Sequence, residues 1–133
     1  MHATVRSRNW GRALKLQMKI IFGALICLLL VSGCGKPKET VLGKAPKGQP
    51  QTILSVRAGT TPSQFTLTGV MIEKCPTAGC WFRLRDNTGV IKVDTKSAAF
   101  VVVDVPLETK ITVAGKVVAD GKDVQIEATG IRY

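Results

Sequence analysis

Histidine is almost absent from this chain of 133 residues, and its single copy is His2. The remaining residues therefore cannot form the Ser-His or Cys-His pairs on which much nucleophilic catalysis depends. The chain also lacks a glycine-rich loop that could cradle phosphates, and the spacing of its few carboxylates singles out no acid–base pair. We predict that the protein is not an enzyme and that it has no resident cofactor.

Long apolar runs are missing as well. The longest uncharged apolar run, residues 20–31, has 12 residues, whereas a membrane-spanning helix needs about 20. A run of this length is typical of the core of a signal peptide. Acidic residues are absent before Glu39, and five basic residues precede the run: Arg6, Arg8, Arg12, Lys15 and Lys19. This order predicts an export signal over residues 1–33, complete whether translation starts at Met1 or at Met18.

The apolar run ends in Val31-Ser32-Gly33-Cys34. Small residues followed by cysteine resemble the lipobox of bacterial lipoproteins, whose cysteine sulfur receives fatty acyl chains such as palmitate. The resemblance implies that Cys34 is lipidated and that the lipid anchor attaches the protein to a membrane of the cell envelope. In such lipoproteins an acidic residue directly after the lipidated cysteine usually signals retention at the inner membrane, but here that position is Gly35. In a bacterium with two membranes, the resemblance therefore implies the outer membrane, facing the periplasm. The alternative is an ordinary signal in which Cys34 is incidental.

Loss of the signal changes the charge balance. The whole chain has a net charge of +10, and residues 34–133 keep 14 basic and 9 acidic residues, a net charge of about +5. This mild excess fits an anionic glycan, a lipid headgroup or an envelope protein as partner, and we expect no nucleic acid. Residues 34–51 are rich in lysine, proline and glycine, which predicts a lipidated flexible tether. Residues 52–133 remain as one small domain.

Five segments of this domain alternate between apolar and polar residues, which predicts β-strands over residues 65–75, 80–86, 90–94, 110–118 and 124–132. Gly69 is expected to bend the first strand and to shift its apolar parity from Phe65 and Leu67 to Val70 and Ile72. Residues 52–57 fit either a leading strand or one helical turn. Residues 95–108 are expected to be extended, because residues 100–103 prefer a strand and Pro106 breaks a helix. The residues expected to point inward on the other strands are Phe82, Leu84, Ile91, Val93, Ile111, Val113, Val124, Ile126 and Ala128.

The succession of these strands and turns resembles the OB-fold over roughly residues 65–133. The resemblance lies in Gly69, Phe82, Leu84, Asp86, Thr88, Gly89, Ile91, Val93, Val113, Gly115 and Val117. It implies an all-β, small five-stranded OB-like barrel after the signal peptide and the tether. The segment Cys75-Pro76-Thr77-Ala78-Gly79-Cys80-Trp81 further resembles a C-P-x-x-G-C-W signature of a poorly characterised family of exported bacterial OB-like domains, which implies no particular activity.

Cys75 and Cys80 are expected to face each other at the base of a hairpin loop. Opposed residues in a β-ladder lie within disulfide range, and thiols outside the cytoplasm usually oxidise, so we predict a structural disulfide. A second reading is a thiol-redox site in which Lys74 lowers a cysteine pKa. A third is a soft-metal site for copper with Met71 as an added ligand. Zinc would have to recruit carboxylates such as Glu73.

Four polar or aromatic side chains are predicted on the outer face of the second and third strands: Trp81, Arg83, Arg85 and Lys92. In OB-folds this face binds oligonucleotides or oligosaccharides. The alternative is an ordinary polar exterior of a barrel. We expect a lipid-anchored, non-catalytic binding module of the cell envelope. The rival hypotheses are a thiol-redox or copper-handling protein that uses Cys75 and Cys80, and a purely structural envelope lipoprotein.

Overall fold

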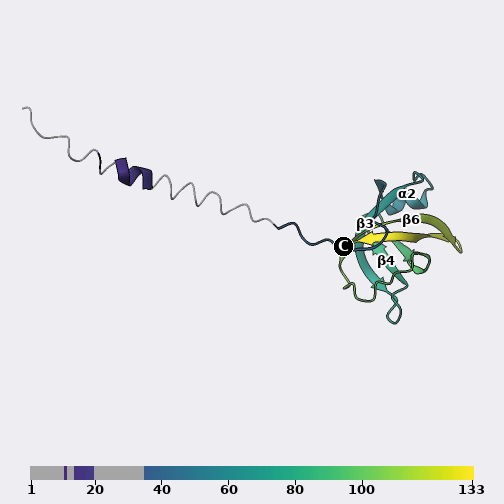
Figure 1. Ribbon diagram of the computed structural model, residues 1–133. Helices are drawn as coiled ribbons and strands as arrows, with labels where there is room; N and C mark the ends of the chain where they lie inside the picture. The colour runs from purple at the N-terminus through teal and green to yellow at the C-terminus, as the bar shows by residue number, and fades with distance from the viewer. Residues whose placement is uncertain (1–10, 12–13, 20–34) are drawn as a thin grey trace, which may run out of the picture. The chain divides into compact units, whose positions relative to one another are not determined.

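The computed structural model describes residue 11, residues 14–19 and residues 35–133, and it divides into two compact units, Met1–Pro37 and Lys38–Tyr133 (Figure 1). In the first unit residues 14–19 are helical. Within the described residues, no helix has the length and apolarity needed to span a bilayer. The predicted signal falls largely, and Cys34 entirely, outside the described residues.

The second unit contains a closed five-stranded β-barrel. Its strands are β3 (Phe65–Lys74), β4 (Trp81–Arg85), β5 (Val90–Asp94), β6 (Lys110–Asp120) and β7 (Asp123–Arg132). The pairs β3–β4, β4–β5, β6–β7 and β3–β6 are antiparallel, and a short parallel pair between β5 and β7 closes the ring. This arrangement confirms the predicted all-β, OB-like barrel.

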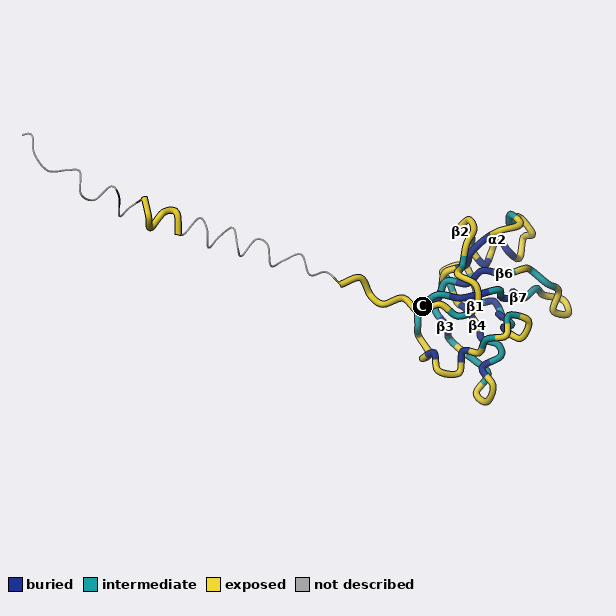
Figure 2. The backbone as a smooth tube through the Cα atoms, viewed as in Figure 1, coloured by how far each residue is buried: buried dark blue, intermediate teal, exposed yellow. Residues whose placement is uncertain are grey.

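The barrel core consists of the inward-facing side chains of every strand, seen as dark blue stretches of the tube in Figure 2. Of the nine side chains expected to point inward on β4 to β7, eight are buried, and Val124, at the start of β7, is only partly buried. The period of two along β4 to β7 therefore located the core correctly, apart from Val124.

Gly69 does not shift the parity of β3, which corrects that expectation. Phe65, Leu67 and Met71 all point inward and are at most 3% exposed, while Val70 is only partly buried. The irregularity in the β3–β4 ladder lies later, between Met71 and Glu73. Glycine stands at position 69 because a Cβ atom there would collide with the carbonyl oxygen of Arg85 on β4. The residue permits a close approach of two strands.

The predicted tether is too long at its C-terminal end. Strand β1 (Val41–Gly43) pairs with β7, and strand β2 (Gln49–Gln51) pairs in parallel with β3. Thr40 and Tyr133 exchange two backbone hydrogen bonds of 2.7 and 3.0 Å, which extend the β1–β7 ladder by one residue. The composition of this segment suggested disorder, but edge strands are stabilised by backbone pairing with an existing sheet and need few apolar side chains.

Residues 52–57 adopt the helical alternative, as helix α2 (Ile53–Arg57). The Thr52 hydroxyl accepts a hydrogen bond from the backbone N–H of Ser55 at 3.2 Å and caps the helix. Ile53 and Val56 are at most 1% exposed, so this short helix covers part of the core. A five-residue helix is unstable by itself, and its burial against the barrel maintains it.

The turn between β4 and β5 holds the start of α2. The Asp86 carboxylate accepts hydrogen bonds from the backbone N–H of Ile53 at 2.8 Å and from the hydroxyl of Thr88 at 2.6 Å. It also accepts from the N–H groups of Thr88 and Gly89, while the Thr88 hydroxyl accepts from the N–H of Leu54 at 3.1 Å. Burial by itself raises the pKa of Asp86, but these hydrogen bonds together hold it below its usual value.

The connection from β5 to β6 contains only one 3-10 turn, η1 (Lys96–Ala98). The absence of an α-helix between β5 and β6 agrees with the expectation from Pro106, but the strand preference of residues 100–103 is not realised. Val102 and Val105 instead turn inward, at most 1% exposed, and seal one end of the core. The segment therefore contributes core side chains without joining the sheet.

Gly115 offers a test of how tightly β6 and β7 pack. A Cβ atom at this position would collide with the carbonyl oxygen of Glu127, and the β6–β7 register shifts beside it. We expect Gly115→Val to lower the free energy of unfolding by about 1–3 kcal/mol, as overpacking does elsewhere. Urea denaturation measures the loss. At Gly35 an added Cβ atom would meet no other atom within 4 Å, so the same change there should have almost no effect on stability. Equal losses of stability at both sites would contradict the proposed close packing of β6 and β7.

Candidate functional site

The outer face of β4 and β5 brings three of the four predicted binding residues together. Trp81, Arg83 and Lys92 line a shallow hollow of about 360 Å³, with Asp120 from the end of β6 as its fourth wall. Arg83 lies opposite Lys92 in the β4–β5 register. Arg85 is on the same strand but does not line the hollow, and it lies 3.8 Å from Glu108 instead. All four side chains therefore lie on the outer face of β4 and β5, as predicted, and three of them line the hollow.

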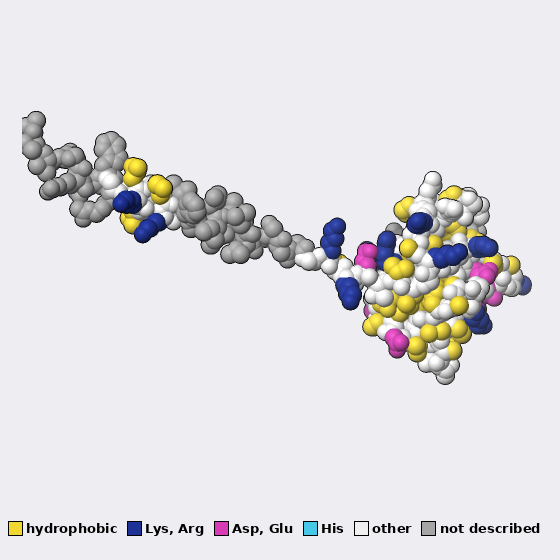
Figure 3. Space-filling model, viewed as in Figure 1, with side chains coloured by type: hydrophobic (Ala, Val, Ile, Leu, Met, Phe, Trp, Pro, Cys, Tyr) yellow, Lys and Arg dark blue, Asp and Glu magenta, His cyan; other side chains and the backbone are white. Residues whose placement is uncertain are grey.

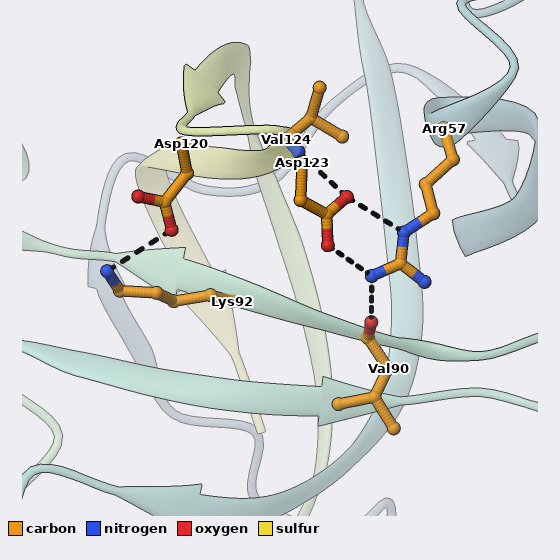
Figure 4. Close-up of polar contacts among 6 residues, drawn as sticks. All are labelled: Arg57, Val90, Lys92, Asp120, Asp123 and Val124. Atoms are coloured by element: carbon orange, nitrogen blue, oxygen red, sulfur yellow. Dashed lines mark hydrogen bonds and ion pairs between the residues drawn. The ribbon is translucent and has the colours of Figure 1, made fainter.

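An ion-pair network borders this hollow (Figure 4). Arg57 of α2 donates hydrogen bonds to both carboxylate oxygens of Asp123, at 3.2 and 3.0 Å, and to the carbonyl oxygen of Val90 at 2.7 Å. Lys92 lies 3.5 Å from Asp120 at the opposite end of the same β6–β7 turn. The bond from Arg57 and a backbone N–H from Val124 lower the pKa of Asp123. The network ties α2, β5 and the turn into one surface.

The charge on this face is mixed. Besides the Lys92–Asp120 pair, Arg83 lies 3.2 Å from Glu73 on β3. On the face shown in Figure 3, basic and acidic side chains are likewise interspersed and do not form one basic field. These pairs are exposed and each contributes little to stability. Their effect is to present donors and acceptors side by side next to an indole ring.

Sequence reasoning missed the contributions of Arg57, Asp120 and Asp123 to this surface. Arg57 and Asp123 are 66 positions apart, and no local pattern links them. The predicted strands imply a turn between residues 118 and 124, but not the direction of the Asp120 carboxylate, because that direction depends on the curvature of the barrel.

A wider hollow of about 640 Å³ lies where residues 44–47 pass β6 and β7. Lys44, Lys47 and Lys116 contribute to its wall. None of the three takes part in an ion pair among the described residues. The sequence does not predict this hollow, because the composition of residues 44–47 is typical of a flexible tether.

The two cysteines do not face each other across the hairpin. Lys74 pairs with Phe82, and the N–H of Cys75 donates to the carbonyl oxygen of Trp81 at 3.0 Å, so Cys75 lies opposite Trp81. Both Cys75 and Cys80 are free thiols and partly buried, so the predicted disulfide is not formed in this structure. The register differs from the expectation because the ladder irregularity after Met71 moves the base of the loop by one residue.

The Cys75 sulfur lies at the start of the turn formed by residues 75–79, beside the Thr77 hydroxyl. Hydrogen bonds from the N–H of Ala78, from the Thr77 hydroxyl 3.7 Å away, and from the N–H groups of Thr77 and Gly79 lower the pKa of Cys75 to about 6. Lys74 plays no part in this shift, contrary to the expectation. Its ammonium donates to the carbonyl oxygens of Val103 and Val105, each at 2.6 Å.

The copper alternative loses its third ligand. Met71 is 0% exposed and belongs to the barrel core, whereas the Cys75 thiol is at the surface. Within residues 11, 14–19 and 35–133, no three His, Cys, Asp or Glu side chains are gathered closely enough to hold a metal. A metal site here would have only the two thiols to supply soft ligands.

The five paired strands, closed by the β5–β7 pair, define the class of protein as an OB-like β-barrel. No known family model matches the chain, and a search of curated proteins also gave no match. Among solved structures, the chain is similar to the hypothetical protein ygiW from E. coli. The two are 22% identical, the match covers 63% of this chain and 88% of that one, and the TM-score is 0.47. The function therefore has to be argued from the site.

Proposed function

We propose that this chain is a lipid-anchored, non-catalytic binding module of the bacterial cell envelope, and that the β4–β5 face binds a glycan. The observation that carries the proposal is the hollow in which Trp81 stands beside Arg83, Lys92 and Asp120. A sugar ring stacks on an indole, and its hydroxyl groups both donate and accept hydrogen bonds. The same face of other OB-folds binds oligosaccharides.

The mixed charge of the hollow favours a glycan over a densely anionic ligand. A polyanion would compete with Glu73 for Arg83 and with Asp120 for Lys92, since each cation already lies within 3.5 Å of a carboxylate. A glycan with many hydroxyl groups and scattered carboxylates can use both signs of charge. It is also a partner that a protein inside the cell envelope meets.

The anchor and the location belong to the same proposal. The order of basic residues, apolar run and Val31-Ser32-Gly33-Cys34 supports export and lipidation of Cys34. In a bacterium with two membranes the barrel would face the periplasm from the outer membrane. An attached lipid keeps the binding face at high local concentration near its ligand.

Trp81→Ala tests the binding face. We expect it to weaken the affinity of the full chain for cell-wall glycan fragments by about tenfold or more, because truncation of a tryptophan that anchors a binding interface typically costs about 2 kcal/mol or more. Titration calorimetry on a Cys34→Ser background separates binding from membrane attachment. Circular dichroism confirms that each variant folds.

Two matched variants serve as controls. Arg85→Ala removes a cation from the same strand but from outside the hollow, and Lys116→Ala alters the wider hollow. Both should bind glycan as the parent does. Equal losses in all three variants, or binding of anionic lipid vesicles with no binding of glycan, would contradict the proposal. Absence of any ligand would favour the purely structural reading.

A further inference from the structure

The loop between β3 and β4 contains two free thiols in unequal surroundings. The Cys75 sulfur lies 3.7 Å from the Thr77 hydroxyl oxygen, and this hydroxyl and the N–H groups of the turn together lower the pKa of Cys75. Hydrogen bonds donated to the charged form of a group favour that form. A thiolate is the nucleophilic form of cysteine, so this surrounding favours reaction at Cys75. The sulfur is open to solvent, and a reagent can reach it.

The backbone holds this arrangement in place. Gly79 has a φ of +57°, a left-handed conformation that turns the loop back, and its N–H donates to the carbonyl oxygen of Cys75 at 3.2 Å. The carbonyl oxygen of Gly79 accepts from Val102 at 2.9 Å, and that of Cys80 accepts from Thr95 at 3.0 Å. The thiol surroundings are therefore preorganised by contacts with the β5–β6 connection.

We propose that the Cys75–Cys80 loop exchanges electrons with disulfides, with Cys75 as the attacking thiol and Cys80 as the resolving thiol. The reacting partner is a small-molecule or protein disulfide, written RSSR. This reaction goes beyond glycan binding and does not depend on it.

The exchange proceeds in two displacements. The Cys75 thiolate attacks one sulfur of RSSR, a new sulfur–sulfur bond forms, and one RS⁻ leaves and takes up a proton. Cys80 then loses its proton and attacks the Cys75 sulfur, which expels the second RS⁻. The two protein thiols are oxidised to one disulfide, and RSSR is reduced to two RSH. The loop must tighten in the second step, because Cys75 lies opposite Trp81 in the free state.

The test uses the full chain with Cys27→Ser and Cys34→Ser, purified in detergent, so that Cys75 and Cys80 are its only thiols. The probe is the aromatic disulfide dithiobis(nitrobenzoate), whose released thiolate is coloured. The parent chain should release two thiolates and retain no adduct by mass spectrometry. Addition of Cys80→Ser should stop the reaction after one release and leave one stable adduct.

Cys75→Ser is the matched comparison for the attacking role. Near pH 6 this variant should react about tenfold more slowly than Cys80→Ser, because the lowered pKa of Cys75 makes its thiolate abundant there, and the lower intrinsic nucleophilicity of that thiolate offsets only part of the advantage. Equal rates for the two variants would overturn the attacking role of Cys75. A parent chain that retains two adducts would overturn the resolving role of Cys80. Either result leaves the glycan proposal intact.

Discussion

Phe82→Ala is expected to lower the free energy of unfolding by about 3–5 kcal/mol, a loss typical of a buried phenylalanine. Phe82 is 0% exposed and stands between Lys74 of β3 and Val93 of β5 in the register. Removal of the phenyl ring would leave a cavity. The surrounding strands can close this cavity only slightly, because hydrogen bonds to β3 and β5 fix the position of β4. A domain of this size has little stability to spare.

Urea unfolding followed by circular dichroism measures the loss through the transition midpoint at constant slope. Leu107→Ala is the matched control, because Leu107 is 51% exposed in the connection before β6. It should change the stability by less than about 0.5 kcal/mol. A Phe82→Ala variant as stable as the Leu107→Ala variant would mean that the side chain is not part of a packed core.

Asp86→Ala is expected to cost about 2–4 kcal/mol, because charge-assisted hydrogen bonds are lost and backbone donors are left unpaired. Asp86 accepts from the N–H of Ile53, and Ile53 is fully buried. The change therefore also weakens the attachment of α2 to the barrel. Asp104→Ala is the control, since Asp104 is exposed and makes no hydrogen bond or ion pair among the described residues.

The effect of Asp86 should depend on pH. Its folded pKa lies below its usual value, so the carboxylate stabilises the fold fully above the unfolded pKa of about 4. This contribution is lost as the pH falls through the lowered folded pKa. The difference in stability between the parent chain and Asp86→Ala should thus be largest near neutral pH and shrink below about pH 4. A difference that grows towards low pH would contradict the assigned role.

The barrel could be predicted because its determinants are local. Alternation along each strand indicates which side chains face inward, and the turn at Asp86 is encoded within the four consecutive residues 86–89. The prediction failed where the outcome depends on another strand. Gly69 suggested a bend, but it serves the approach of Arg85 on β4. The edge strands at residues 41–51 have no apolar pattern, because they are held by backbone pairing with β7 and β3.

For the candidate sites, too, local features could be predicted from the sequence and contacts with other strands could not. Trp81, Arg83 and Lys92 could be assigned to one face from strand parity alone. Their partners Glu73 and Asp120 could not, because those contacts depend on how β3 and the β6–β7 turn curve around the barrel. For the cysteines, composition indicated reactive chemistry but a shift of one residue in the ladder decided the geometry. Lys74 was the obvious charge near Cys75, yet three carbonyl oxygens of the β5–β6 connection accept hydrogen bonds from its ammonium.

The pairing of Thr40 with Tyr133 limits how far the barrel can lie from Cys34, because the paired chain after Thr40 belongs to the sheet. Only residues 35–40 separate Cys34 from strand β1, and six extended residues span at most about 20 Å. If Cys34 carries lipid as proposed, the barrel samples a thin layer next to the bilayer and cannot explore the width of the periplasm. The barrel can therefore bind only glycan strands, and react only with protein disulfides, that come within about one domain diameter of the membrane.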